Sequence, residues 1–191
     1  MNSLLFGKSK KSTQFIARTG ILLALTIAMQ YVCATFIKVQ LITGSVVNAF
    51  LIIAAGSVGI VGAGLIGLFT PILGFLTGVV GNILLTPFIG LANACFVVVY
   101  ALLINAFKVD YKKGLKDAKN IALGVSSYVL GAGAKFLFMF FVCLKLILPL
   151  VLPQIAPPIE VAFGITQLWT ALIGGTIGFI TTTLFAKTDV I

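Results

Sequence analysis

Long apolar runs constrain this chain more than any other feature of its sequence. Six of them follow one another with short polar gaps between, at about 15–37, 42–56, 59–82, 88–107, 120–148 and 162–186. A helix needs roughly 17–25 predominantly apolar residues to cross the hydrocarbon core of a bilayer. Helices also satisfy their backbone groups internally where no water is present. The pattern therefore predicts an all-α integral membrane protein with six transmembrane helices, forming a single membrane domain over residues 1–191.

The overall composition supports a membrane protein and argues against a soluble domain. Hydrophobic residues make up 60% of the chain and charged residues 9%, and the mean hydropathy is +1.21. Soluble domains average about 45–50% apolar and about 25% charged residues. A soluble fold of this size has too little interior to hide so much apolar surface.

Positive charge marks one side of the predicted bundle. The net charge is +9, and ten of the 13 basic residues flank the first span on its N-terminal side, lie in the fourth gap or follow the sixth span. With six spans these segments share one side, which the positive-inside rule identifies as the cytoplasm. Both termini are therefore expected to be cytoplasmic, and nucleic-acid binding is not expected. The ten residues are Lys8, Lys10, Lys11, Arg18, Lys108, Lys112, Lys113, Lys116, Lys119 and Lys187.

Small residues recur at helical spacing. Gly20, Ala24 and Ala28 lie four residues apart and share one face of the first span. Because small residues let helices in lipid approach closely, this stripe predicts a docking surface for another helix, in this chain or in a partner. The glycine pairs 74/78 and 174/178 have the same spacing and favour ordinary packing within the bundle. Closely spaced glycines blur the boundary between the second and third spans, and the short second span is compatible with a tilted or partly interfacial helix.

The sequence offers little for catalysis or metal binding. It has no histidine, and Cys33, Cys95 and Cys143 all lie inside apolar runs. No carboxylate pair or nucleophile–base pair can be proposed. Gly7-Lys8-Ser9 ends like a phosphate-binding loop but lacks the required earlier glycine. We expect neither an enzyme nor a resident metal or cofactor.

Polar residues inside the spans are the candidate site. A charge at a helix centre costs about 2.5–3.5 kcal/mol on insertion scales and usually marks function. Lys135 lies deep in the fifth span with no acid expected at its depth, so it predicts contact with an anion such as a substrate carboxylate; a purely structural lysine is the alternative. Lys38 and Lys145 lie nearer the outer ends and are better explained as interfacial anchors.

Further candidates are amides, an aromatic residue and one acid. Asn48, Asn93 and Gln167 interrupt apolar runs, and each either bridges helices or contacts a substrate. Trp169, two residues after Gln167, is expected near a pocket below the outer loops. Glu160 stands alone in the proline-containing outer gap and completes the candidate set.

Three short motifs support a family resemblance that covers essentially the whole chain. Ala24-Leu25-Thr26-Ile27-Ala28 matches an Ala-x-x-x-Ala motif, Gly44-Ser45-Val46-Val47-Asn48 leads into the second span, and Pro87-Phe88-Ile89-Gly90-Leu91-Ala92-Asn93 leads into the fourth. With its size, six spans and basic cytoplasmic ends, the chain resembles an S component of an energy-coupling factor (ECF) transporter, the substrate-binding membrane subunit of a vitamin importer.

The resemblance implies a function and a set of partners. It implies capture of a vitamin-like molecule from outside a prokaryotic plasma membrane, in a pocket formed by helices four to six and the outer loops. It implies that Ala24 and Ala28 dock on a transmembrane coupling subunit, which two cytoplasmic ATPases bind. Lys135 favours an anionic ligand such as pantothenate, biotin, lipoate or a folate. The alternatives are a stand-alone secondary transporter, which should show inverted repeats, a ligand-free structural membrane protein and a membrane enzyme.

Overall fold

The computed structural model describes residues 12–151 and 157–187, and the regular structure within these ranges is entirely helical. Six helical segments there are long and apolar enough to cross a membrane: Ser12–Ile37, Gln40–Ser57, Gly59–Leu76, Ile83–Ala106, Ala118–Ile147 and Ile165–Ala186. The predicted helical, multi-pass membrane protein is confirmed.

Most spans begin and end within three residues of the predicted positions. The bounds are α2 Ser12–Val32 with the π-helix η1 Cys33–Ile37, α3 Gln40–Ser57, α4 Gly59–Leu76, the 3₁₀ turn η2 Ile83–Leu85, α5 Thr86–Ala106, the 3₁₀ turn η3 Gly114–Lys116, α6 Ala118–Leu137 with the π-helix η4 Phe138–Ile147, α7 Leu148–Val151, α8 Pro157–Phe163 and α9 Ile165–Lys187.

The third span is shorter than the predicted 59–82. Helix α4 ends at Leu76, and the backbone N–H groups of Val79 and Val80 both donate to the Gly74 carbonyl, at 2.8 and 3.0 Å. Gly78 follows the helix end with φ +76°, a left-handed conformation that glycine adopts without steric cost. Apolar residues continue beyond this turn, which is why hydropathy alone places the end too late.

Helix α3 lies in the interior of the bundle, so its short length does not make it partly interfacial. It packs against α9, α4 and α2, and Leu51 and Ile52 have no exposed surface. A Cβ atom added at Gly174 would lie 2.6 Å from Asn48 Cβ, and one at Gly178 would lie 2.7 Å from Ile52 Cβ. The second predicted glycine pair therefore sets the close approach of α9 to α3.

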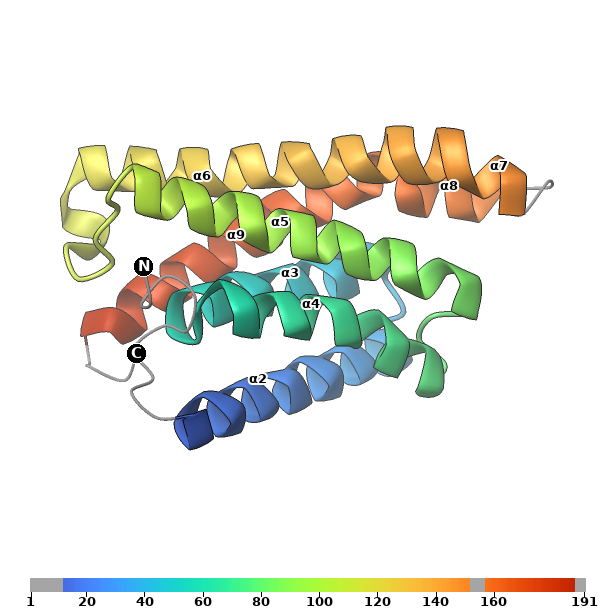
Figure 1. The fold of residues 1–191 in the computed structure, drawn as a ribbon, viewed down its shortest axis with the longest axis horizontal. Coiled ribbons are helices and arrows are strands. Elements are labelled where there is room, and N and C mark those ends of the chain that lie inside the picture. Colours follow the sequence, from blue (N-terminus) through green and yellow to red (C-terminus); the bar gives the residue numbers. More distant parts are fainter. Residues whose placement is uncertain (1–11, 152–156, 188–191) are drawn as a thin grey trace.

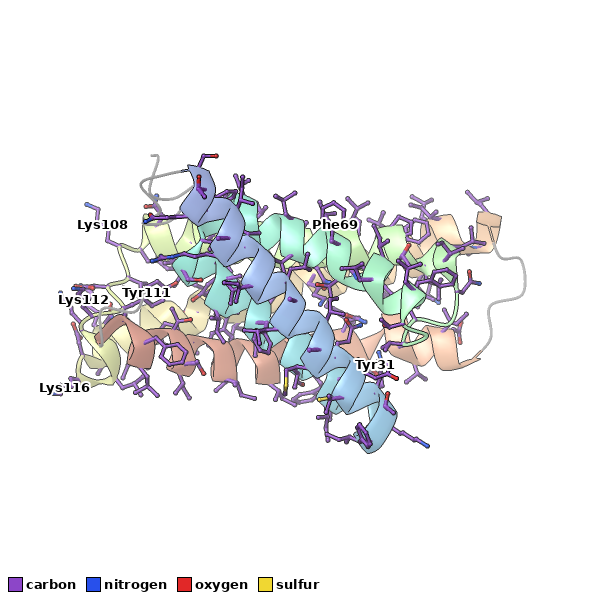
Figure 2. The ribbon with its side chains drawn as sticks, turned by 90° about the horizontal axis from the view of Figure 1, so that it is seen from below. Tyr31, Phe69, Lys108, Tyr111, Lys112 and Lys116 are labelled. Atoms are coloured by element: carbon purple, nitrogen blue, oxygen red, sulfur yellow. The ribbon has the colours of Figure 1, made fainter. Side chains whose placement is uncertain are left out.

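Helix α2 lies on the periphery (Figure 1), and it crosses the other helices obliquely when the molecule is viewed from below (Figure 2). Its buried side chains include Thr26 and Gln30, whereas Gly20, Ala24 and Ala28 are exposed. The small-residue stripe is thus exposed and is not buried in the interior of the bundle.

The basic segments gather at one end. The start of α2, the connection between α5 and α6 and the end of α9 all lie at the same end of the bundle (Figure 1). Lys108, Lys112 and Lys116 extend from that connection (Figure 2). Asn120 holds the connection in place, because its side chain accepts from the N–H of Asp110 and donates to the carbonyl of the same residue, at 2.8 and 3.0 Å. We call this end the basic end.

Candidate functional site: a buried lysine between two asparagines

Lys135 lies inside the bundle on α6. Glycine at position 131, one turn earlier, lets α6 approach α5, since a Cβ atom there would lie 3.1 Å from the Phe96 ring. The Lys135 side chain is only 3% exposed. Its ammonium donates to Asn48 Oδ1 of α3 at 2.7 Å and to Asn93 Oδ1 of α5 at 2.8 Å. Three of the sequence-predicted site residues therefore form one cluster that joins three helices.

Both asparagines are held by backbone carbonyls. Asn48 Nδ2 donates to the Gly44 carbonyl at 2.9 Å, and Asn93 Nδ2 donates to the Gly67 carbonyl at 3.2 Å. With each amide nitrogen engaged in this way, each amide oxygen faces Lys135. Two neutral amide oxygens therefore solvate the ammonium of Lys135.

Amide oxygens solvate the charge of Lys135 without neutralising it. Within residues 12–151 and 157–187 the hydrogen-bond partners of its ammonium are the two asparagines, and none is a carboxylate. The Phe96 ring lies 5.8 Å away, measured from the ammonium to the ring centroid, and adds a cation–π contact. Two of the three N–H groups of the ammonium are engaged, so one remains for a further acceptor.

A cavity of about 80 Å³ lies against this cluster. Asn48, Asn93 and Lys135 form part of its wall, and the other polar side chains that line it are Gln30, Gln40, Thr43, Thr70, Gln167 and Thr170. These residues come from α2, α3, α4 and α9. The wall is thus built by most of the bundle, and not mainly by the fourth to sixth spans as the family resemblance implied.

The cavity lies in the half of the bundle away from the basic end. Gln40, at the first position of α3, and Val79 and Val80, just after α4, line it. These positions lie where the chain turns at the end opposite the basic connection. Asn48 is eight residues into α3, or roughly 12 Å at 1.5 Å per residue.

The threonine hydroxyl groups on the cavity wall can mainly accept hydrogen bonds from a ligand. Thr43 donates to the Val39 carbonyl at 3.3 Å and Thr70 to the Ile66 carbonyl at 2.5 Å. Thr170 donates to the carbonyl of residue 167 at 3.2 Å. Because each hydroxyl donates its proton to a backbone carbonyl three or four residues earlier, only the oxygen lone pairs remain available to the cavity.

Gln167 is also on the wall, next to the junction of α8 and α9. Its Nε2 donates to the Ala162 carbonyl at 2.8 Å, and the Gly164 N–H donates to the Glu160 carbonyl at 2.9 Å. The buried Gln167 side chain therefore stabilises the junction and lines the cavity at once.

Other sequence candidates lie elsewhere. Trp169 is 53% exposed, Glu160 is exposed on α8, and neither lines the cavity. Lys145 is exposed, with its ammonium 5.4 Å from the centroid of the Phe140 ring. Lys38 is exposed at the turn between η1 and α3, with φ 57°.

Sequence reasoning missed Gln30, Gln40 and the three threonines. Gln30 is 7% exposed, and it is an amide inside an apolar run, which is the same signal that identified Asn48. Threonines are common in membrane helices and bond to their own backbone, so their sequence pattern carries little information about a cavity.

The docking candidates form a separate feature on the outside of α2. Gly20, Ala24 and Ala28 line an open apolar groove between α2 and α4, together with Leu73 and Thr77. This groove and the lysine cavity therefore lie on different sides of α2.

No family model, curated protein or solved structure matches this chain.

Proposed function

We propose that this chain is the substrate-binding membrane subunit of an ECF-type importer. In this proposal it captures a vitamin or related small molecule from outside a prokaryotic plasma membrane and is not itself an enzyme. Uptake is driven by two cytoplasmic ATPases, which act through a transmembrane coupling subunit bound to this chain. The basic end faces the cytoplasm under the positive-inside rule, so the lysine cavity lies in the outer half of the membrane.

The observation that carries the proposal is the buried, charged cluster at the cavity wall. Lys135 is bound by Asn48 and Asn93 through oxygens alone. A core that served stability alone would be better filled by apolar side chains, because taking a charge out of water is costly. A ligand carboxylate supplies the opposite charge and an acceptor for the remaining N–H of the ammonium.

The cavity volume limits how a ligand enters. A space of about 80 Å³ accommodates the terminal group of a small molecule better than a whole vitamin, since sites for drug-sized ligands are typically about 300–1,000 Å³. We therefore expect the carboxylate to enter first. The remainder of the ligand then occupies space that opens near Gln40, Val79 and Val80.

A ligand screen with paired lysine variants tests the proposal. The purified chain in detergent is heated with biotin, pantothenate, lipoate, folate or thiamine, and its unfolding temperature is followed. A ligand at a thousandfold excess over its dissociation constant stabilises a protein by about 4 kcal/mol. We expect a carboxylate ligand to stabilise the wild type and Lys145→Met, which alters an exposed lysine of the same span, but not Lys135→Met.

Each other outcome has a defined meaning. If Lys135→Met bound the ligand as tightly as wild type, Lys135 would not recognise an anion. If thiamine alone stabilised the protein, the ligand would not be an anion, but the chain would still be a substrate-binding subunit. Substrate uptake by this chain alone in vesicles without ATP would favour the secondary transporter. A folded chain that binds none of the five compounds would contradict the proposed function.

A further inference from the structure

An unpaired acceptor lies on the cavity wall at Gln30. This side chain of α2 is 7% exposed and lines the cavity. Its Oε1 atom is buried, and no described residue donates a hydrogen bond to it. Buried amide oxygens are nearly always paired in native proteins, so this oxygen points to a donor supplied by something that enters the cavity.

The position of Gln30 depends on a specific close approach to α4. A Cβ atom at Gly74 would lie 2.8 Å from Gln30 Nε2, so glycine at that position leaves room for the amide. Thr26, one turn earlier on the same face of α2, uses its hydroxyl proton on the Leu22 carbonyl at 2.6 Å. It therefore has no proton to offer to Gln30.

The cavity wall carries both an unused donor and an unused acceptor. Lys135 offers one remaining N–H at one part of the wall. Gln30 Oε1 and the lone pairs of the three threonine hydroxyls offer acceptors at others. A ligand that carried only a carboxylate would satisfy Lys135 and leave Gln30 without a partner.

We infer that Gln30 is a specificity-determining residue, and that the ligand is a carboxylic acid that also carries a hydroxyl or N–H donor for Gln30 Oε1. This inference rests on the proposed function and narrows its substrate class. Biotin, with ureido N–H groups, and pantothenate, with hydroxyl and amide donors, belong to this class. Lipoate and octanoate have the carboxylate without such a donor and do not.

The test measures the affinities of biotin, pantothenate, lipoate and octanoate for the purified full chain by calorimetry. Wild type is expected to bind biotin or pantothenate at least tenfold more tightly than lipoate and octanoate, since a site built for a donor rejects analogues that lack it. Gln30→Met keeps the length of the side chain and removes the acceptor, so it should weaken binding of the donor-bearing acid by about tenfold. Binding of lipoate should not weaken in this variant.

The outcomes separate this inference from the proposed function. The inference would be wrong if lipoate or octanoate bound as tightly as the donor-bearing acids, or if Gln30→Met kept the wild-type preference. Either result would mean that water satisfies Gln30 Oε1. The proposed function would still stand. Loss of binding of all four acids in a folded Gln30→Met variant would also contradict it, because a loss independent of the donor indicates a structural role. If folded wild type bound none of the four acids, the inference would fall together with the anionic-ligand part of the proposed function.

Discussion

The ammonium of Lys135 donates a 2.8 Å hydrogen bond to the amide oxygen of Asn93, which precedes it by 42 residues in the chain. This bond joins α6 to α5 within the membrane span. Its partner bond to Asn48 extends the connection to α3. The cluster therefore couples the positions of three helices as well as shaping the cavity.

A double-mutant cycle should show that Lys135 and Asn93 act as a unit. Asn93→Leu leaves the ammonium with one fewer acceptor, and we expect it to destabilise the protein by about 1.5–3 kcal/mol, the usual range for a hydrogen bond to a charged group. Adding Asn93→Leu to Lys135→Met should cost much less, because no buried charge then remains to be solvated. Denaturant unfolding in detergent measures both free energies. Additive effects of the two substitutions would mean that the hydrogen bond contributes nothing to stability.

Glycine at 174 should be required for the α3–α9 contact. Gly174→Val places side-chain atoms against α3, where even a Cβ atom would lie 2.6 Å from Asn48 Cβ, and overpacking of this kind costs about 1–3 kcal/mol. Gly133→Ala is the matched control, since a Cβ atom there meets nothing within 4 Å. We expect a clearly lower unfolding temperature for Gly174→Val and little change for the control. Equal unfolding temperatures for both variants would contradict the packing described for α9.

Much of this architecture was predictable because hydropathy reports directly on the environment of each span. The runs of apolar residues located all six spans, and the exceptions have local causes. The end of α4 depends on the backbone conformation of Gly78, which hydropathy does not encode. The interior position of α3 depends on tertiary contacts with α9, so the length of the span alone could not predict it.

The candidate site was predictable only in part. Lys135, Asn48, Asn93 and Gln167 were identifiable because a polar group inside a lipid-spanning run must have a partner. Which of them meet could not be read from the sequence, since that depends on how each helix is rotated about its axis. Trp169 shows the same limitation, because its depth along α9 was plausible while its orientation places it outside the cavity.

The stripe on α2 should matter for assembly and not for folding. Ala24→Leu combined with Ala28→Leu adds bulk at two exposed positions, so stability should change by no more than about 0.5 kcal/mol. Under the proposed function, co-purification with the coupling subunit and its ATPases should be lost while ligand binding is retained. Leu25→Ala combined with Met29→Ala, two exposed positions on the same helix, serves as the control. Intact assembly with the leucine variant would remove the docking role of the stripe.

Alkaline pH should weaken the contact at the basic end between Tyr111 and Tyr100. Their hydroxyl oxygens lie 3.0 Å apart. Burial raises the pKa of Tyr111 to about 12, and the hydrogen bond with Tyr100 opposes part of this rise. Because the folded-state pKa lies above the unfolded value of about 10, the protonated hydroxyl contributes stability that is fully present below pH 10 and is lost as pH rises through 12. A shift of two units corresponds to at most about 2.7 kcal/mol.

Comparison with a phenylalanine variant isolates this effect from other groups that titrate at high pH. The stability difference between wild type and Tyr111→Phe should be constant up to about pH 10 and should then change in favour of the variant. A pH-independent difference for Tyr111→Phe would mean that its hydroxyl does not titrate in this range.

Neighbouring positions on α9 should differ sharply in their effect on ligand binding. Gln167 and Trp169 are two residues apart, so their side chains point about 200° apart around the helix. Gln167 is 8% exposed and lines the cavity, whereas Trp169 is 53% exposed. We therefore expect Gln167→Leu to weaken binding of a carboxylate ligand by about tenfold, the effect of losing one hydrogen-bonding group. Trp169→Ala should leave the affinity unchanged, because this residue does not line the cavity. Calorimetry with the ligand found in the screen measures both affinities.

If Trp169→Ala abolished binding in a folded protein, the ligand would have to reach the outer face of α9, and the lysine cavity would not be the complete binding site.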